Sequence, residues 1–282
     1  MKVMVVGHRS NLSKALIPFL SSFADVVLAG RSDSDVVLDL CGPLDKFVIP
    51  SGLDVVINLA ACFGGTDTAD IDRSMETNVL GAYKLAQACT ANGVKTLLQV
   101  SSIFSHLTDS SPFYSSYALS KKYMEKLLEM YCKSAELNLT IVRPTQLYGE
   151  GDEFRKHQPS IYRMLDQAQN GEDVVIYGKN DALRNFMHVD DAAKTIALAV
   201  SQELFGSYDC MNLSNIRLSD IANAALSAFD SSRSVIFDVG KPDIPDNIFN
   251  IDTSIFGRLG FLPQISMDQG MVREAVRRMG EA

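Results

Sequence analysis

Three residues near the middle of the chain have the types and spacing needed to transfer a proton to oxygen. Tyr117 and Lys121 lie four residues apart in a segment with helical spacing of apolar residues, so they share one helical face. A tyrosine hydroxyl, with a pKa of about 10, is a poor acid near neutral pH unless its anion is stabilised. A nearby ammonium provides that stabilisation, and a serine hydroxyl can polarise a carbonyl oxygen. We therefore predict an acid–base site made of Ser102, Tyr117 and Lys121.

The serine of this site follows a predicted strand. Residues 96–100 read Thr-Leu-Leu-Gln-Val, which is typical of a buried strand, and Ser101 and Ser102 come directly after it. We prefer Ser102, and the sequence leaves Ser101 open. A Tyr-x-x-x-Lys pair occurs often by chance, so its value here comes from lying one loop after a strand that ends in two serines.

The rest of the chain predicts the elements that hold these residues. Apolar runs predict strands over 3–6, 26–29, 36–40, 54–61, 96–100 and 139–144, and helical spacing predicts helices over 14–22, 71–91, 117–134 and 192–200. Strands that alternate with helices and are rich in Val, Ile and Leu indicate parallel pairing. We predict an α/β fold: a Rossmann-like, doubly wound parallel sheet with a smaller C-terminal substrate-binding lobe. The predicted boundaries are 1–149 and about 185–205 for the NADP(H)-binding Rossmann domain, and about 150–184 and 206–282 for the lobe.

The turn after the first strand is a candidate phosphate site. Backbone N–H groups and the helix dipole at a helix N-terminus favour an anion. Such turns usually carry three glycines, whereas this turn has Gly7 and then Ser10 and Ser13, so the motif alone is weak. The residues that we expect to bind the cofactor here are Gly7, Arg9, Ser10, Asn11 and Leu12.

Arg31 favours a particular cofactor. It follows the second strand, where an acidic residue binds the 2′-hydroxyl of NAD and an arginine accommodates the 2′-phosphate of NADP. With Arg9 in the first turn, this predicts NADP(H), and NAD(H) stays as the alternative. Further expected cofactor contacts are Asp39 and Leu40 near the adenine, and Leu59, Ala60 and Ala61 under its ribose.

Composition narrows the class of protein. The net charge of −8 argues against a nucleic-acid surface and against an anionic membrane. No apolar run approaches the roughly 20 residues that span a bilayer. The five cysteines and four histidines are scattered, so we expect reduced thiols, no metal site and a cytoplasmic location.

Taken together, these residues resemble the extended short-chain dehydrogenase/reductases of the NAD-dependent epimerase/dehydratase family, which act on nucleotide-activated sugars. The resemblance covers about residues 1–200. The matching motifs are the Gly7 turn, Asp39-Leu40, Asn58-Leu-Ala-Ala61, Asn78 in Glu-Thr-Asn-Val-Leu-Gly, Val-Ser-Ser102, Tyr117-x-x-x-Lys121, Arg143-Pro144, Tyr148-Gly149 and Arg184-Asn-Phe-Met-His-Val-Asp-Asp191. The cofactor turn, with Arg31 and Asp33, is most similar to the NADPH-dependent GDP-fucose synthase type.

The resemblance implies roles for further residues. Asn78 would support the active site near the substrate, and Arg184 would contact the diphosphate of a sugar nucleotide. Pro144 to Leu147 would lie near the nicotinamide, which Tyr117 and Lys121 would also contact. The resemblance also implies a homodimer formed through the helices at 71–91 and 117–134.

Departures from the family pattern count against one of the family's reactions. Dehydratases of this family carry Asp-Glu after the catalytic serine or threonine, whereas Ile103-Phe104 follow here, which counts against water elimination. His106 and Gln146 also differ from the usual family residues. Our first hypothesis is an NADPH-dependent reductase of a nucleotide-activated 4-keto-6-deoxy sugar. The alternatives are an NAD-dependent 4-epimerase of a nucleotide hexose, a dinucleotide-sensing protein that has lost catalysis, and a reductase of a non-sugar carbonyl.

Overall fold

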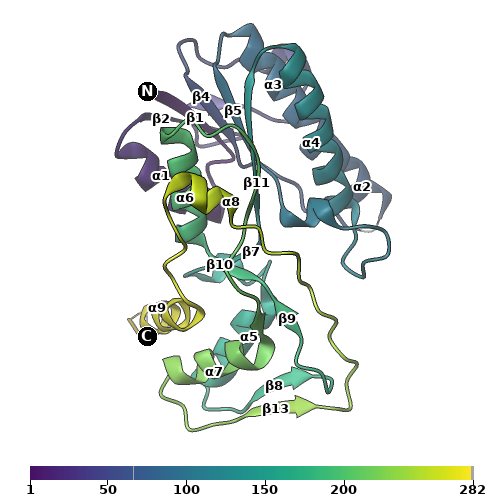
Figure 1. Ribbon diagram of the computed structural model, residues 1–282, viewed down its shortest axis with the longest axis vertical. Coiled ribbons are helices and arrows are strands. Elements are labelled where there is room, and N and C mark those ends of the chain that lie inside the picture. Colours follow the sequence, from purple (N-terminus) through teal and green to yellow (C-terminus); the bar gives the residue numbers. More distant parts are fainter. Residues whose placement is uncertain (66, 281–282) are drawn as a thin grey trace. The chain divides into compact units, whose positions relative to one another are not determined.

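The computed structural model describes residues 1–65 and 67–280, and the chain forms two compact units (Figure 1). The first unit contains Met1–Pro144, Ala193–Cys210 and Ser254–Phe261, and the second contains Thr145–Ala192, Met211–Thr253 and Leu262–Ala282. The chain therefore passes several times between the units. None of the described helices is both long enough and apolar enough to cross a membrane.

The first unit is built on a seven-stranded, fully parallel sheet with the order β11-β6-β5-β4-β1-β2-β3. Its strands are β1 (Lys2–Val6), β2 (Asp25–Gly30), β3 (Val36–Val37), β4 (Val55–Asn58), β5 (Thr96–Val100), β6 (Asn138–Pro144) and β11 (Gly206–Cys210). The central strands are buried, which explains their continuous apolar runs. The predicted Rossmann-like α/β fold is confirmed.

Helices follow most of these strands. They are α1 (Asn11–Ser21), α2 (Thr68–Ser74), the π-helical segment η2 (Met75–Gly81), α3 (Ala82–Ala91), the short η3 (Ile103–His106), α4 (Ser116–Ser134), α6 (Val189–Ser201) and α8 (Ser254–Leu259), with a single turn η1 (Leu44–Lys46). The predicted helix over 71–91 is thus a run of three pieces whose middle is π-helical. Such π-helical turns are rare and often mark functional sites.

Strand β11 is the main difference from the predicted boundaries. It pairs in parallel with β6, from Gly206 opposite Thr140 to Cys210 opposite Pro144, so it belongs to the sheet of the first unit. Its sequence, Gly-Ser-Tyr-Asp-Cys, has no apolar run, and for this reason the sequence assigned it to the C-terminal lobe. Residues 254–261, which form α8 and contact β11, also lie in the first unit.

The second unit packs three helices with three small sheets. The helices are α5 (Pro159–Gln169), α7 (Leu218–Ala228) and α9 (Met267–Gly280), and a short turn, η4, covers Asp152–Phe154. The strand pairs are β7 (Gln146–Tyr148) with β10 (Phe186–His188), β8 (Val174–Tyr177) with β13 (Val235–Asp238), and β9 (Leu183–Arg184) with β12 (Ile216–Arg217). Short strands and polar loops make this unit hard to delimit from the sequence.

Gly7 directly follows β1, where the backbone after β4 comes very close. Its φ is +85°, and a Cβ at this position would lie 2.7 Å from the backbone nitrogen of Ala60. We predict that Gly7→Ala lowers the free energy of unfolding by about 2–4 kcal/mol, because left-handed strain and steric overlap add. Urea denaturation measures this loss.

A second glycine provides the control. Gly52 has a φ of +73°, but a Cβ at this position would meet nothing within 4 Å, so Gly52→Ala carries only the backbone strain. We expect it to cost about 1–2 kcal/mol. Equal losses in the two variants would show that the contact with Ala60 does not constrain Gly7.

Candidate active site

The structure brings the three predicted acid–base residues together in the first unit. Tyr117 and Lys121 lie on one face of α4, and the Lys121 ammonium is 5.7 Å from the centre of the Tyr117 ring. Ser102, just past the end of β5, forms a side-chain hydrogen bond with Tyr117. Helix α4 begins at this point because Ser115 caps it and accepts a hydrogen bond from the Ala118 backbone N–H at 3.4 Å. The cap therefore sets where Tyr117 lies on the first turn.

The two serines after β5 have different partners. The Ser101 hydroxyl donates to the carboxylate of Glu125 and is buried. The Ser102 oxygen accepts from the backbone N–H of Phe104 at 3.2 Å and bonds with Tyr117. This geometry favours Ser102 over Ser101 as the hydroxyl that polarises a substrate.

Burial shifts the two titrating groups toward their neutral forms. It raises the pKa of Tyr117 to about 12, and the hydrogen bond from Ser102 opposes the rise. Burial lowers the pKa of Lys121, which is 2 % exposed, to about 8, and the charge of Glu125 opposes the fall. The Lys121 ammonium donates to the carbonyl of Val100 at 3.0 Å. At pH 7, therefore, the tyrosine holds a proton to donate and the lysine is charged.

Asn78, predicted to lie near the substrate, instead bonds to protein groups. Its Oδ1 accepts from the backbone N–H of Cys62 at 2.8 Å, and its Nδ2 donates to the Cys62 carbonyl at 2.7 Å and to the Ser120 hydroxyl at 2.9 Å. Both amide hydrogens are thus used. Asn78 ties the loop after β4 to α4, next to Lys121, and the π-helical turn directs its side chain there. The predicted role as a support fits this geometry, and the assignment as a substrate contact does not.

The turn between β1 and α1 joins a close backbone approach to a capped helix N-terminus. Gly7 leaves room for the close approach of Ala60. Ser10 caps α1 by accepting from the backbone N–H of Ser13 at 3.2 Å. A glycine at position 10 could not make this cap, which explains one departure from the three-glycine pattern. A helix N-terminus behind a glycine turn fits the phosphates of a nicotinamide dinucleotide.

Basic side chains lie at the ends of β1 and β2. The Arg9 guanidinium donates to the Ser32 hydroxyl at 3.1 Å and lies 3.6 Å from the Asp33 carboxylate. The Arg9 side chain is 70 % exposed, and Arg31 is also exposed. The two side chains are thus accessible to an anionic ligand, and their contact with the 2′-phosphate of NADP stays a prediction.

Comparison with known proteins now identifies the family. A family model described as NAD dependent epimerase/dehydratase family matches residues 3–213. The chain belongs to this family. It is 26 % identical over 306 residues to the GDP-L-fucose synthase of Escherichia coli (strain K12), covering 96 % of this chain and 94 % of that one. The predicted family, and with it an NAD(P)-dependent enzyme, is confirmed.

Solved structures of similar fold include an epimerase and a protein bound to NADPH. A UDP-N-acetylglucosamine 4-epimerase from Bacillus cereus gives a TM-score of 0.80 at 20 % identity, covering 100 % of this chain and 97 % of that one. RMD from Pseudomonas aeruginosa, complexed with NADPH, gives a TM-score of 0.78 at 18 % identity, covering 100 % and 98 %. At these identities the likeness establishes the fold alone.

In this epimerase/dehydratase family member, the predicted adenine contacts are only partly accessible. Asp39 is exposed, and its Oδ1 accepts from the backbone N–H of Cys41 at 3.1 Å. Leu40 and Leu59 are buried, so they can offer a ligand little beyond backbone groups. Ala60 and Ala61 are partly buried and carry small side chains, which suits a closely packed ribose.

The second unit of the family member holds Arg184, predicted to contact a diphosphate. Its guanidinium is buried and donates to the backbone carbonyls of Leu183 and Pro245, both at 2.8 Å. Burial lowers the pKa of Arg184, and Asp246 opposes this. Both bonds come from one guanidinium nitrogen, Nη1, and the diphosphate contact stays a prediction.

Sequence reasoning missed a cationic cluster around Tyr177 in the same unit. The guanidinium of Arg163 lies 4.4 Å from the centre of the Tyr177 ring, and the ammonium of Lys241 lies 5.9 Å from it. The three residues come from α5, β8 and the segment after β13, so only the folded chain unites them. An exposed aromatic ring with two cations beside it is suited to a base and a phosphate.

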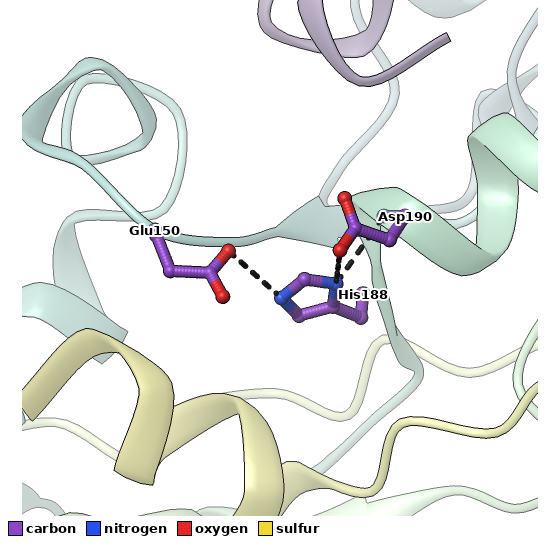
Figure 2. Close-up of side chains that lie close together, drawn as sticks. All are labelled: Glu150, His188 and Asp190. Atoms are coloured by element: carbon purple, nitrogen blue, oxygen red, sulfur yellow. Dashed lines mark hydrogen bonds and ion pairs between the residues drawn. The ribbon is translucent and has the colours of Figure 1, made fainter. Parts of the chain in front are cut away.

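His188 forms a second polar cluster, with Glu150 and Asp190 (Figure 2). The Asp190 backbone N–H donates to Nδ1 at 3.2 Å, so the neutral ring carries its proton on Nε2, which lies 3.2 Å from Glu150. Arg273 supplies positive charge, at 3.0 Å from Asp190 and 3.7 Å from Glu150. His188 is fully buried. This arrangement supports a structural role for His188, since the Arg273 guanidinium pairs with both carboxylates.

Proposed function

We propose that this protein is an NADPH-dependent reductase of a nucleotide-activated 4-keto-6-deoxy sugar. The observation that carries the proposal is the hydrogen-bonded Ser102 and Tyr117 beside the buried Lys121 ammonium, in a unit that also presents Arg9 and Arg31. The group of Ser102, Tyr117 and Lys121 suits reduction of a carbonyl group, and the two arginines suit the binding of NADPH. The similarity to the GDP-L-fucose synthase of Escherichia coli supports the same interpretation.

The side chains divide the work of reduction among them. Bound NADPH supplies the hydride that reduces the carbonyl carbon. The Ser102 hydroxyl donates a hydrogen bond to the carbonyl oxygen, which becomes an alkoxide. Tyr117 gives its proton to that oxygen, and the Lys121 ammonium stabilises the phenolate that remains. Gly7, Ser10 and the N-terminus of α1 would hold the phosphates of the cofactor.

The second unit would recognise the nucleotide part of the substrate. Tyr177 offers an aromatic face to a base, and Arg163 and Lys241 offer positive charge to a diphosphate. We infer that Arg184 orders this region through its bonds to Leu183 and Pro245 as well as binding the diphosphate.

Two further assignments belong to the proposal. All five cysteines are free thiols, which suits a reducing, cytoplasmic location. A homodimer would cover apolar side chains that are exposed on η2 and α4, namely Leu80, Tyr123 and Met130. Light scattering of the purified protein tests the dimer, and a monomeric mass at micromolar concentration would exclude it.

The affinities for NADPH and NADH test the proposed role of Arg9 and Arg31. We predict that replacing Arg9 and Arg31 together with alanine weakens NADPH binding by about 10- to 100-fold, because the charge-assisted bonds of two exposed arginines to a phosphate together contribute about 1.5–3 kcal/mol. NADH binding should stay within about twofold, since NADH lacks the phosphate. Fluorescence titration of both cofactors measures this.

Arg73 is a suitable control because it is an exposed arginine of the same unit, on α2. Arg73→Ala should leave both affinities unchanged. Wild-type protein that binds NADH more tightly than NADPH, or that purifies with bound NAD⁺, would overturn the NADPH assignment and favour the 4-epimerase alternative.

A further inference from the structure

Three consecutive residues, the last of β5 and the two that follow it, form hydrogen bonds with side chains of α4. The pairs, with the strand residue first, are Val100–Lys121, Ser101–Glu125 and Ser102–Tyr117. Their partners on α4 are four residues apart, so they form a row along one face of the helix. Two of these pairs hold members of the proposed acid–base site. The third, Ser101–Glu125, has no role in the proposed chemistry.

Glu125 is held at the centre of a buried charged network. It is 5 % exposed, and the Arg143 guanidinium binds both of its oxygens at 2.9–3.0 Å. Arg143 also donates to Asp209 at 3.2 Å, and the His106 ring lies 2.9 Å from Asp209. The network thus runs from α4 through β6 and β11 to η3. Bidentate, charge-assisted bonds of this kind fix geometry closely.

One end of this network lies next to members of the acid–base site along α4 and β5. Glu125 lies one helical turn after Lys121, where an opposite charge favours the ammonium. Ser101, which donates to Glu125, directly precedes Ser102, and His106 ends the short η3 segment that follows Ser102.

We propose that Glu125 is a positioning residue: it keeps the Lys121 ammonium charged in a buried site, and through Ser101 it holds Ser102 against Tyr117. Only the activity part of this inference rests on the proposed function. The groups that face Lys121 are Tyr117 and Glu125 from α4 and the Val100 carbonyl from β5. Of these, Glu125 is the one that bears a carboxyl group.

The direct test is the titration of Lys121 itself, which needs neither cofactor nor substrate. In protein labelled with ¹³C-lysine, the Lys121 side-chain resonance can be assigned by its loss in Lys121→Arg and followed with pH. We expect Glu125→Gln to move this titration to lower pH by about one unit, because the neutral amide no longer favours the ammonium. An unchanged titration in the folded variant would overturn the role of Glu125 toward Lys121.

Ser101→Ala tests the second role and leaves the Glu125–Arg143 pair intact, so it serves even if Glu125→Gln does not fold. We expect kcat to fall about 10- to 100-fold through misplaced Ser102, with NADPH affinity unchanged and the free energy of unfolding lowered by the loss of a buried hydrogen bond. The isotope effect with deuterated NADPH should increase, because hydride transfer becomes slower relative to product release.

Ser105→Ala is the matched control. Ser105 is a buried serine of the neighbouring η3 segment, and within the described residues its hydroxyl has no hydrogen-bond partner. It should keep wild-type kcat and isotope effect. If Ser101→Ala and Ser105→Ala behave alike, the positioning role is wrong. If the enzyme reduces no carbonyl at all, the proposed function fails while the Lys121 titration still decides the role of Glu125.

Discussion

Replacing Tyr117 with phenylalanine is expected to lower kcat for carbonyl reduction by about 10²–10⁴-fold, the usual contribution of a general acid. The variant loses the side-chain proton that the site offers directly to the new alkoxide. The phenyl ring keeps its volume and its stacking on Phe63, whose ring centre lies 5.1 Å away. Stability and NADPH affinity should therefore change little. Single-turnover oxidation of NADPH, followed by its absorbance, measures the loss.

Tyr114 gives a matched control for this variant. It lies three residues before Tyr117, is also partly buried, and takes no part in the hydrogen bond with Ser102. Tyr114→Phe should keep more than half of wild-type kcat. The proposed role of Tyr117 would be wrong if its phenylalanine variant kept a tenth or more of the activity.

Lys121→Met is the second variant with a large expected effect. Loss of the ammonium removes the charge that stabilises the Tyr117 phenolate, and an opposite charge at this range shifts a pKa by about 1–3 units, so kcat at pH 7 should fall about 10- to 10³-fold. Lys122, the next residue, is exposed and provides the control, because Lys122→Met removes an equal charge outside the site.

The pH dependence of the wild-type enzyme follows from the same group. Since the pKa of Lys121 is lowered to about 8, kcat should be constant below that pH and fall about tenfold per pH unit above it. Stability should change in the opposite direction. In the unfolded chain this lysine has a pKa of 10.5. Between about pH 8 and pH 10.5 the unfolded chain therefore binds more protons than the folded protein, and the free energy of unfolding rises with pH.

A fall in kcat together with a rise in the free energy of unfolding would show that the activity is lost by titration of Lys121 and not by unfolding of the protein. In Lys121→Arg the side chain stays charged throughout, so its residual activity should not fall between about pH 8 and 10. An alkaline loss of the same steepness in that variant would assign the titration to another group.

The sequence predicted the acid–base site because its residues are close along the chain or lie directly after one strand. Tyr117 and Lys121 share a helix, and Ser102 follows the preceding strand. The parallel sheet was likewise predictable from continuous apolar runs. Strand β11 was not, because an edge strand of polar residues carries no such signal, and its partner β6 is far away along the chain.

Side-chain roles that depend on distant partners could not be predicted. Asn78 was expected near the substrate, yet a π-helical turn directs its amide to Cys62 and Ser120. Helical periodicity does not reveal such a turn. The Arg163 and Lys241 contacts with Tyr177 depend on three separate segments, and no spacing in the sequence brings them together.

The most direct test of the central claim is to follow deuterium from NADPH into product. The enzyme is incubated with a panel of GDP-, dTDP- and UDP-linked 4-keto-6-deoxy sugars and NADPH deuterated at its transferable position. The reductase assignment predicts that one sugar is reduced, with one deuterium at C4 for each NADPH oxidised. No oxidation across the panel, together with bound NAD⁺ and interconversion of C4 epimers of a nucleotide hexose, would contradict it.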